Sequence, residues 1–315
     1  MAQAHICFIL HGRRCPAHLP NRLLELFSPD FDVSIHITSS SLGAEDAACL
    51  AVERGCDYLV SVGGDGTIHE MVNGVMRVDA DRRERVVLGV LPYGTGNDFA
   101  RTLGIDDSAT GLLRLIRARQ VRRLDLGRLL LGNADGGVRV CYFANIASLG
   151  ISSAVVDRVA TLPRWFPSSL AYAVGTLWSL VGWRGARMRL VADDGSIREE
   201  TLINLCLANG RYFGGGLGVA PAASPDDGLL DMVLIRNASI GAFLRFLPAL
   251  RHGRRIDDPR VLYARCRSLK IDTLPPGCPL EADGERIGSA PVTIDLLPGA
   301  LAWLCADADV VADCG

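Results

Sequence analysis

A glycine-rich turn at residues 63–67, Gly-Gly-Asp-Gly-Thr, has the composition of an anion-binding loop. It follows an apolar, β-branched run over residues 58–62 and precedes apolar residues that recur at helical spacing from 68 to 75. A strand, a glycine turn and a helix start direct unpaired backbone N–H groups and the positive end of a helix dipole at one point. Asp65 either caps this helix, or a cation or a hydroxyl accompanies the ligand.

A second turn of the same kind follows one strand later in the chain. The apolar run 86–91 leads into residues 92–98, Pro-Tyr-Gly-Thr-Gly-Asn-Asp, and a short helix is expected over 98–103. Either Asn97 or Asp98 could cap that helix. Because ligands bind beyond the carboxyl ends of parallel strands, one turn could hold phosphates while the other closes on them.

Two acidic turns lie in the second half of the chain. One contains Asp226, Asp227 and Gly228, and the other is the run Glu281-Ala282-Asp283-Gly284-Glu285. Read as bare chemistry, both are turn signals whose acids face water. Their spacing alone does not indicate a catalytic or metal-binding role.

The composition limits the class of protein. The chain has 315 residues, enough for two domains, and its formal net charge of −2 gives no support to nucleic-acid binding. Lys270 is the only lysine, so no P-loop motif is present, and the ten cysteines form no C-x-x-C pair. No apolar run is long enough to cross a bilayer, which predicts a cytoplasmic protein that can still touch the inner membrane surface.

The hydrophobic pattern changes near residue 124. Before it, strands and helices alternate: strands at 5–10, 31–38, 58–62 and 86–91, and helices at 19–27 and 43–54. This alternation predicts a parallel sheet covered on both faces. After residue 124, strand-like runs follow a hairpin pattern at 125–147 with few helices between them, which predicts an antiparallel β-sandwich.

Two further segments have alternative interpretations. Residues 154–183 are the least polar part of the chain, and they form either a packed helix, a wall of an acyl-chain site, or a surface at the lipid interface. The basic run 251–255 either faces water or contacts anionic lipid headgroups.

The motifs GGDGT at 63–67 and LPYGTGNDFAR at 91–101 resemble the catalytic domain of diacylglycerol kinases and of the bacterial YegS-like lipid kinases. These families are similar to sphingosine kinases and, more distantly, to NAD kinases and 6-phosphofructokinases. The resemblance implies a Rossmann-like three-layer α/β domain over 1–124, to which about 299–315 return. It also implies a β-sandwich domain over 125–298 that carries the lipid site, with the active site in the cleft between the two.

The resemblance also implies roles for individual residues. The general base would be Asp283, with Glu285 as its partner or the alternative, and Asp65 would join them in catalysis. A Mg²⁺ ion would be held by the Asp227 carboxylate and the carbonyls of Ser224 and Leu229. The residues implied for ATP binding are Thr38, Ser39, Gly63, Gly64, Asp65, Gly66, Thr67, Ile68, His69, Gly94, Thr95 and Asn97.

The function implied is an ATP-dependent lipid kinase that phosphorylates the primary hydroxyl of a diacylglycerol-like membrane lipid, with Mg²⁺ as cofactor. Self-association into a homodimer stays open. One alternative is a kinase of a soluble substrate such as NAD, although the GTGND segment and the missing LGFL-like continuation count against it. Another is a nucleotide- or lipid-binding module without activity. The segment 11–14, HGRR, departs from the NPxSG of many relatives, which leaves its phosphate contact open.

Overall fold

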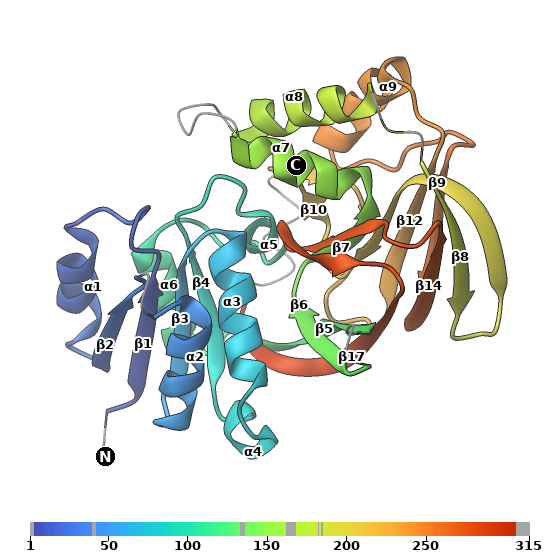
Figure 1. The fold of residues 1–315 in the computed structure, drawn as a ribbon. Coiled ribbons are helices and arrows are strands. Elements are labelled where there is room, and N and C mark those ends of the chain that lie inside the picture. The colour runs from blue at the N-terminus through green and yellow to red at the C-terminus, as the bar shows by residue number, and fades with distance from the viewer. Residues whose placement is uncertain are drawn as a thin grey trace. The chain divides into compact units, whose positions relative to one another are not determined.

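The computed structural model describes residues 3–39, 42–132, 136–161, 168–181, 183 and 185–306. The chain divides into two compact units, one of residues 1–124 with 299–315 and one of residues 125–298 (Figure 1). Of the expected returning segment, residues 307–315 lie outside the described part.

The first unit is built on a parallel sheet. Its strands are β1 (His5–Leu10), β2 (Asp32–Ile37), β3 (Tyr58–Gly63) and β4 (Val87–Pro92), joined by the end of β17 (Val292–Leu304). β1 pairs with β2 and β3, β3 also pairs with β4, and β17 pairs with β4 through Ala302 and Trp303. The interior strands are apolar and buried along almost their whole length, as expected for a sheet covered on both faces. The predicted α/β architecture is therefore confirmed for this half of the chain.

Helices connect these strands. They are α1 (Leu19–Phe27), α2 (Ala44–Glu53), α3 (Asp65–Met76), α4 (Ala80–Arg83), α5 (Asp98–Thr102) and α6 (Ala109–Arg117). Gly55, with φ +80°, follows the end of α2, where the sequence predicts a stop. On the other face of the sheet from α2 and α3, Phe8 packs edge-on against Phe27 of α1 in a cluster shared with α6. The α6 helix was not predicted from the sequence, although Ser108 caps it by accepting the Gly111 N–H at 2.9 Å.

The second unit is mostly antiparallel β-structure. Its strands are β5 (Val121–Gly132), β6 (Val138–Phe143), β7 (Ile146–Gly150), β8 (Ala186–Ala192), β9 (Ile197–Ala208), β10 (Tyr212–Phe213), β11 (Leu217–Gly218), β12 (Leu230–Arg236), β13 (Val261–Cys266), β14 (Ser268–Leu274), β15 (Pro279–Ala282), β16 (Glu285–Ser289) and the start of β17. The pairings of β5 with β6, β7 with β9, β9 with β8 and β12, and β15 with β16 are antiparallel. The predicted hairpin and the predicted strands of the second half are confirmed.

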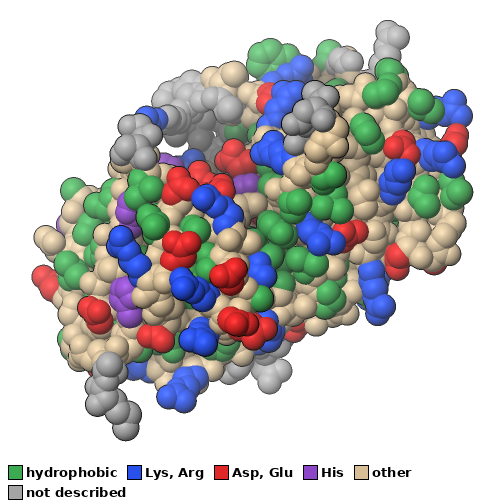
Figure 2. Space-filling view, turned by 60° about the horizontal axis from the view of Figure 1, so that its bottom comes forward, with side chains coloured by type: hydrophobic (Ala, Val, Ile, Leu, Met, Phe, Trp, Pro, Cys, Tyr) green, Lys and Arg blue, Asp and Glu red, His purple; other side chains and the backbone are tan. Residues whose placement is uncertain are grey.

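Three helices accompany these strands: α7 (Ile151–Thr161), α8 (Ser168–Leu180) and α9 (Ile240–Arg251). α7 and α8 arise from the apolar segment for which a helix was predicted, while residues 164–166 of that prediction lie outside the described part. α9 was not predicted; Pro248 inside it obscures the helical pattern. Within the described residues, no helix is long and apolar enough to span a membrane. On the face shown in Figure 2, basic and acidic side chains are interspersed, as the near-neutral net charge leads one to expect.

Candidate functional site

Four loops of the first unit leave its parallel sheet at the same edge. The strand registers align Leu10 with Ile37 and Val62, and Gly63 with Pro92, so the carboxyl ends of β1, β2, β3 and β4 lie together. The residues predicted to bind nucleotide lie at the end of β3 or in the segments that follow β2, β3 and β4. The structure therefore brings that predicted set to one edge of the sheet, which is where parallel sheets bind ligands.

The first glycine loop joins β3 to α3 with no intervening residues other than Gly64. Gly64 is the N-cap position, and α3 begins at Asp65, ahead of the helical spacing that the sequence shows over residues 68–75. A Cβ on Gly63 would overlap the Thr67 side chain, so this position has room for glycine but not for a residue with a side chain. Thr67, Ile68 and His69 are buried, and the N–H groups of Thr67 and Ile68 donate to the Gly64 carbonyl, which leaves the earlier N–H groups of the loop to face a ligand.

The second glycine loop is closed by Asn97. Its side chain accepts the Gly94 N–H at 2.9 Å and donates to the Gly94 carbonyl at 3.0 Å, and its φ of +53° places it in the left-handed region. Asn97 occupies the predicted N-cap position of α5, but its side chain is engaged inside its own loop and makes no capping hydrogen bond. Thr95 lies at the exposed tip of the loop.

Asp65 caps α5 from the neighbouring loop. Its carboxylate accepts the Asp98 N–H at 3.2 Å and the Phe99 N–H at 3.1 Å. The two loops are also in close backbone contact, since a Cβ on Gly64 would lie 3.0 Å from the Gly94 Cα. Asp65 therefore ties the two glycine loops into one structure, a role that the sequence pattern did not indicate.

The remaining edge residues come from the loops after β1 and β2. The Thr38 hydroxyl accepts the Gly12 N–H at 3.1 Å, and the Ser39 hydroxyl accepts the Leu42 N–H at 3.4 Å. Arg14 reaches the first glycine loop, with its Nη1 3.4 Å from the position that a Cβ on Gly64 would occupy. The segment that departs from the pattern of relatives thus supplies a guanidinium beside the predicted phosphate loop.

In the second unit, Asp283 and Gly284 form the two-residue turn between β15 and β16. Both have positive φ, +52° and +85°, as a tight hairpin turn requires. The Asp283 carboxylate is only 6% exposed and accepts three backbone N–H groups, from Ala144 at 3.0 Å, Asn145 at 2.9 Å and Ile146 at 3.1 Å. These bonds fix the connection between β6 and β7, so the side chain predicted as the general base holds the turn in place. Glu285, on the other side of Gly284, is exposed.

Sequence reasoning did not single out Glu281, which is fully buried in the same hairpin. Its carboxylate accepts the Ser148 hydroxyl and the Gly284 N–H, the latter at 3.0 Å. The Ser148 hydroxyl is also 2.5 Å from that of Ser152, at the start of α7. One feature of the sequence indicates this network: Glu281 is an acid inside an apolar strand. A buried carboxylate needs hydrogen-bond donors, so such an acid predicts polar partners around it.

The turn predicted to hold Mg²⁺ is linked to the Asp283 turn by a chain of hydrogen bonds. The Ala144 carbonyl accepts from Asn209 at 2.8 Å, Asn209 also donates to the Asp125 carbonyl, and the Asp125 carboxylate accepts the Gly228 N–H at 2.8 Å. Within the turn, the Asp227 carboxylate accepts the Leu229 N–H at 3.0 Å. Both predicted acidic sites of the second unit therefore belong to one connected polar region.

Carbonyl oxygens and acidic side chains are concentrated at the turn that contains Asp227. The Ser224 carbonyl accepts the Asp227 N–H at 3.4 Å, and Arg265 lies 3.7 Å from the Asp227 carboxylate. Burial, and then the charge of Asp227, raise the pKa of Asp231, whose buried Oδ2 has no hydrogen-bond partner among the described residues. Among those residues no cluster of three or more His, Cys, Asp or Glu side chains is placed to bind a metal, so a cation here would depend on backbone carbonyls and water.

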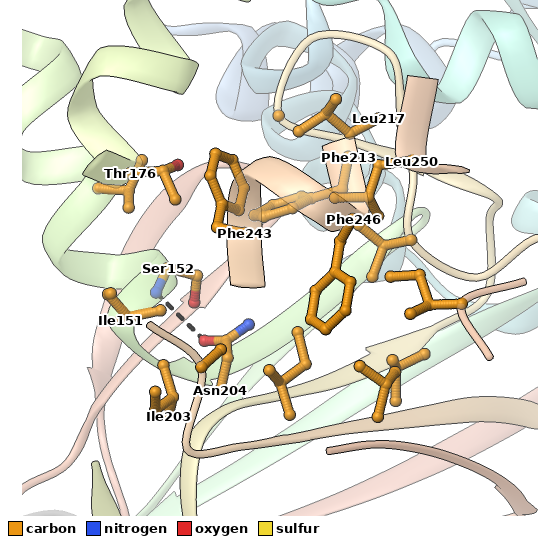
Figure 3. Close-up of a pocket in the computed structure, with 18 of the residues that line it drawn as sticks. Ile151, Ser152, Thr176, Ile203, Asn204, Phe213, Leu217, Phe243, Phe246 and Leu250 are labelled. Atoms are coloured by element: carbon orange, nitrogen blue, oxygen red, sulfur yellow. Dashed lines mark hydrogen bonds between the residues drawn. The ribbon is translucent and has the colours of Figure 1, made fainter. Parts of the chain in front are cut away.

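An apolar pocket of about 910 Å³, its open mouth included, lies in the second unit between three helices and the sheet (Figure 3). Its walls come from α7, α8 and α9 and from strands β9, β12 and β13. The lining is mainly aliphatic and aromatic, with Phe243 and Phe246 of α9 facing Ile151 and Ile203. The polar residues Ser152, Thr176 and Asn204 are grouped on one side of it, and a hydrogen bond of 3.2 Å joins the Ser152 N–H to the Asn204 side-chain oxygen.

Two protein-family models match the chain. The diacylglycerol kinase catalytic domain matches residues 5–129, and the YegS C-terminal NAD kinase beta sandwich-like domain matches residues 145–305. A diacylglycerol kinase of Bacillus subtilis is 29% identical over 276 residues, which cover 87% of this chain and 86% of that protein. A diacylglycerol kinase of Mycobacterium tuberculosis is 31% identical over 255 residues, covering 80% and 77%.

Solved structures share the fold. A diacylglycerol kinase from Bacillus anthracis superposes with a TM-score of 0.69 at 20% identity, covering 96% of this chain and 97% of that one. Yeast NADH kinase superposes with a TM-score of 0.51 at 13% identity, covering 98% and 85%. These likenesses confirm the predicted relation to the NAD kinase fold, and at such identities they concern the fold alone.

Proposed function

This chain belongs to the diacylglycerol kinase family, and we propose that it transfers the γ-phosphate of ATP to the primary hydroxyl of a diacylglycerol-like lipid. The observation that carries the proposal is the apolar pocket of the second unit, because a kinase of a soluble acceptor such as NAD has no use for it. A pocket with this apolar lining can remove part of an acyl chain from water, which stabilises binding by about 0.8 kcal/mol for each buried methylene.

The nucleotide part of the proposal rests on the loop edge of the first unit. Backbone N–H groups at the start of α3 and the Arg14 guanidinium favour the phosphates of ATP at this edge. The Arg14 guanidinium lies beside this loop, where its positive charge would attract a ligand phosphate. Thr38, Ser39 and Thr95 would contact the rest of the nucleotide from the neighbouring loops.

A Mg²⁺ ion is part of the proposal at the turn that contains Asp227. The Asp227 carboxylate and the carbonyls of Ser224 and Leu229 are hard oxygen donors of the type that binds this cation. Arg265 already lies beside both acids, 3.3 Å from the Asp231 carboxylate and 3.7 Å from that of Asp227, so the ion would share this region with a guanidinium. When bound, the ion would supply positive charge that keeps these acids ionised and the polar region of the second unit in order.

The acceptor hydroxyl needs a base, and we assign that role to Glu285 rather than to Asp283. Asp283 is buried and its oxygens already accept three backbone N–H groups, whereas Glu285 is exposed in the same turn. Glu285 would accept the proton of the lipid hydroxyl as its oxygen attacks the γ-phosphorus and ADP leaves. Phosphoryl transfer depends mainly on such positioning and on charge neutralisation, which Arg14 would provide.

Contact with a membrane would bring the acceptor within reach. Trp178 of α8, Val181 after it, and Ile240 and Leu244 of α9 are exposed although they are apolar. Neither helix carries an acid, and Arg245 and Arg251 of α9 would favour anionic lipid headgroups. Both helices border the pocket, so we propose a cytoplasmic protein that docks transiently on the inner membrane through this face.

The test is transfer of labelled phosphate from ATP, with Mg²⁺, to lipids in mixed micelles and to NAD. The panel contains diacylglycerol, monoacylglycerol, phosphatidylglycerol and sphingosine, with Glu285→Gln as the inactive control. Label in a glycerolipid that is lost in the variant supports the proposal. Label in NAD alone would move the protein to the NAD kinases, and binding of ATP without transfer to any acceptor would favour the catalytically silent module.

A further inference from the structure

The apolar pocket has a polar side, formed by Ser152 and Asn204. Both residues are buried, at 4% and 5% exposure, and both line the pocket. Asn204 lies on β9 and Ser152 on the first turn of α7, so the sheet and a helix each contribute one group (Figure 3). Binding of hydrocarbon does not require these polar groups. Burying them has a free-energy cost unless they are hydrogen-bonded, so their hydrogen-bond partners matter.

The Asn204 amide is only half satisfied by the protein. Its oxygen accepts the Ser152 N–H at 3.2 Å, which fixes the orientation of the amide group. Its nitrogen donates to the Cys206 sulfur at 3.1 Å, and burial raises the pKa of that thiol to about 12, so the acceptor is a neutral sulfur. Neutral sulfur is a weak acceptor, and an amide nitrogen carries two N–H groups. Among the described residues, no oxygen accepts either of them.

The Ser152 hydroxyl is not that acceptor: among the described residues the Asn204 nitrogen bonds to the Cys206 sulfur, and the Ser152 hydroxyl contacts that of Ser148. The Ser148 hydroxyl contacts both the Ser152 hydroxyl and the Glu281 carboxylate. A hydroxyl has one proton, so Ser148 donates to only one of these two oxygens at a time. The Ser152 hydroxyl lies against Ser148, and the Asn204 nitrogen, which points toward the pocket interior in Figure 3, is the donor left for a ligand.

We infer that Asn204 donates a hydrogen bond to the carbonyl oxygen of an acyl ester whose chain lies in the pocket. The inference rests on the proposed function, since it concerns the lipid acceptor, and it narrows the substrate class to lipids with a carbonyl next to the chain. An alkyl ether or a sphingoid base has no such oxygen and leaves the amide donor unpaired. One hydrogen bond of this kind corresponds to about a three- to tenfold difference in affinity.

The test compares 1-octanoylglycerol with 1-O-octylglycerol, which differ in the ester carbonyl and stay monomeric below their critical micelle concentrations. Calorimetric titration of the full chain without ATP measures binding alone. The wild-type protein is expected to bind the ester about three- to tenfold more tightly. Asn204→Leu should abolish the preference by weakening ester binding, while the affinity for the ether stays the same or rises.

Two further variants separate this result from a change in the fold. Asn204→Asp keeps an oxygen to accept the Ser152 N–H but has no amide N–H, so it should also lose the preference. Phe246→Ala removes apolar contact in the same pocket and should weaken both ligands equally. Equal binding of ester and ether by the wild type, a preference that persists in Asn204→Leu, or affinities unaffected by Phe246→Ala would overturn the inference.

The outcome is also separable from that of the kinase proposal. A preference for the ester that disappears in Asn204→Leu, in a protein that transfers no phosphate, would leave the inference standing and remove the proposed activity. Phosphate transfer to ester and ether lipids with equal KM would support the proposed activity and overturn the inference about Asn204.

Discussion

Asp65 and Asp283 are acids beside a glycine in a tight turn, one in each unit, and both accept backbone N–H groups from a neighbouring loop. Asp65 is half-buried and accepts two such groups at 3.1 and 3.2 Å, at the start of a helix. Asp283 is buried and accepts three, at 2.9 to 3.1 Å, from consecutive residues of one connection. Asp283 is the more deeply buried of the two, and this difference in burial indicates that its carboxylate contributes more to folding than that of Asp65.

The comparison also separates the residues that organise a site from those that face a ligand. The sequence marks Asp65, Asp283 and Glu285 in the same way, as acids near glycine. Only the structure shows that two of them have their carboxylates committed to backbone groups, while Glu285 is exposed. The largest predicted effect on activity therefore falls on a different residue from the largest predicted effect on stability.

Glu285→Gln should have the largest effect. Loss of the base is expected to lower kcat for lipid phosphorylation by about 100-fold or more, with the melting temperature within a degree or two of wild type. The measurements are initial rates with saturating ATP and thermal unfolding of the same preparations. If this variant retains more than a tenth of wild-type turnover, the base assignment is wrong.

Asp283→Asn should have the largest effect on stability. The amide offers one acceptor oxygen in place of two, so buried N–H groups lose their partner, and we expect unfolding free energy to fall by about 2–4 kcal/mol. Asn adopts positive φ readily, so backbone strain is not the cause. Urea unfolding measures the change, and a difference below 1 kcal/mol would remove the structural role of Asp283.

Asp65→Ala should cost less, about 1 kcal/mol of unfolding free energy, as for the loss of a helix cap. Because the same carboxylate holds the two glycine loops together, the affinity for ATP should also fall. Ser108→Ala is the matched control, since it removes the cap of α6 without touching either glycine loop. Equal ATP affinity in the two variants would mean that tying the loops together has no part in nucleotide binding.

Glu200→Gln should have the smallest effect on stability. Unlike Asp65 and Asp283, Glu200 is paired with a side chain rather than with backbone N–H groups. Hydrogen bonding and charge from Arg236, at 2.7 Å, lower the pKa of Glu200. A depressed folded-state pKa contributes stability above the ordinary value of 4.5, and that stability is lost as the pH falls through the lowered pKa. The pair is partly exposed, so Glu200→Gln should cost less than about 1 kcal/mol at pH 7. Unfolding measured in urea should show the difference from wild type shrinking below pH 4.5, and a constant difference would contradict the pairing.

Local patterns of the sequence were sufficient for most elements. Apolar runs and helical spacing gave β1, α1 and β3 within a residue or two, and Gly55 gave the end of α2. The glycine loops were identified because their chemistry is carried by the backbone of a few consecutive residues. α6 and α9 were missed, the second because Pro248 interrupts a helix that tertiary packing nevertheless stabilises.

The sequence by itself determined the alternation of strands and helices, the glycine loops at the carboxyl ends of parallel strands, and the family resemblance, since all of these depend on residues close together in the chain. The tertiary structure decided which acids are committed to backbone N–H groups, because their donors come from segments distant in sequence. It also decided the pocket, whose wall is assembled from three helices and several strands, and the half-satisfied amide of Asn204 within it. Long-range packing sets burial and hydrogen-bond partners, and these properties distinguish a residue that holds a site together from one that acts on a ligand.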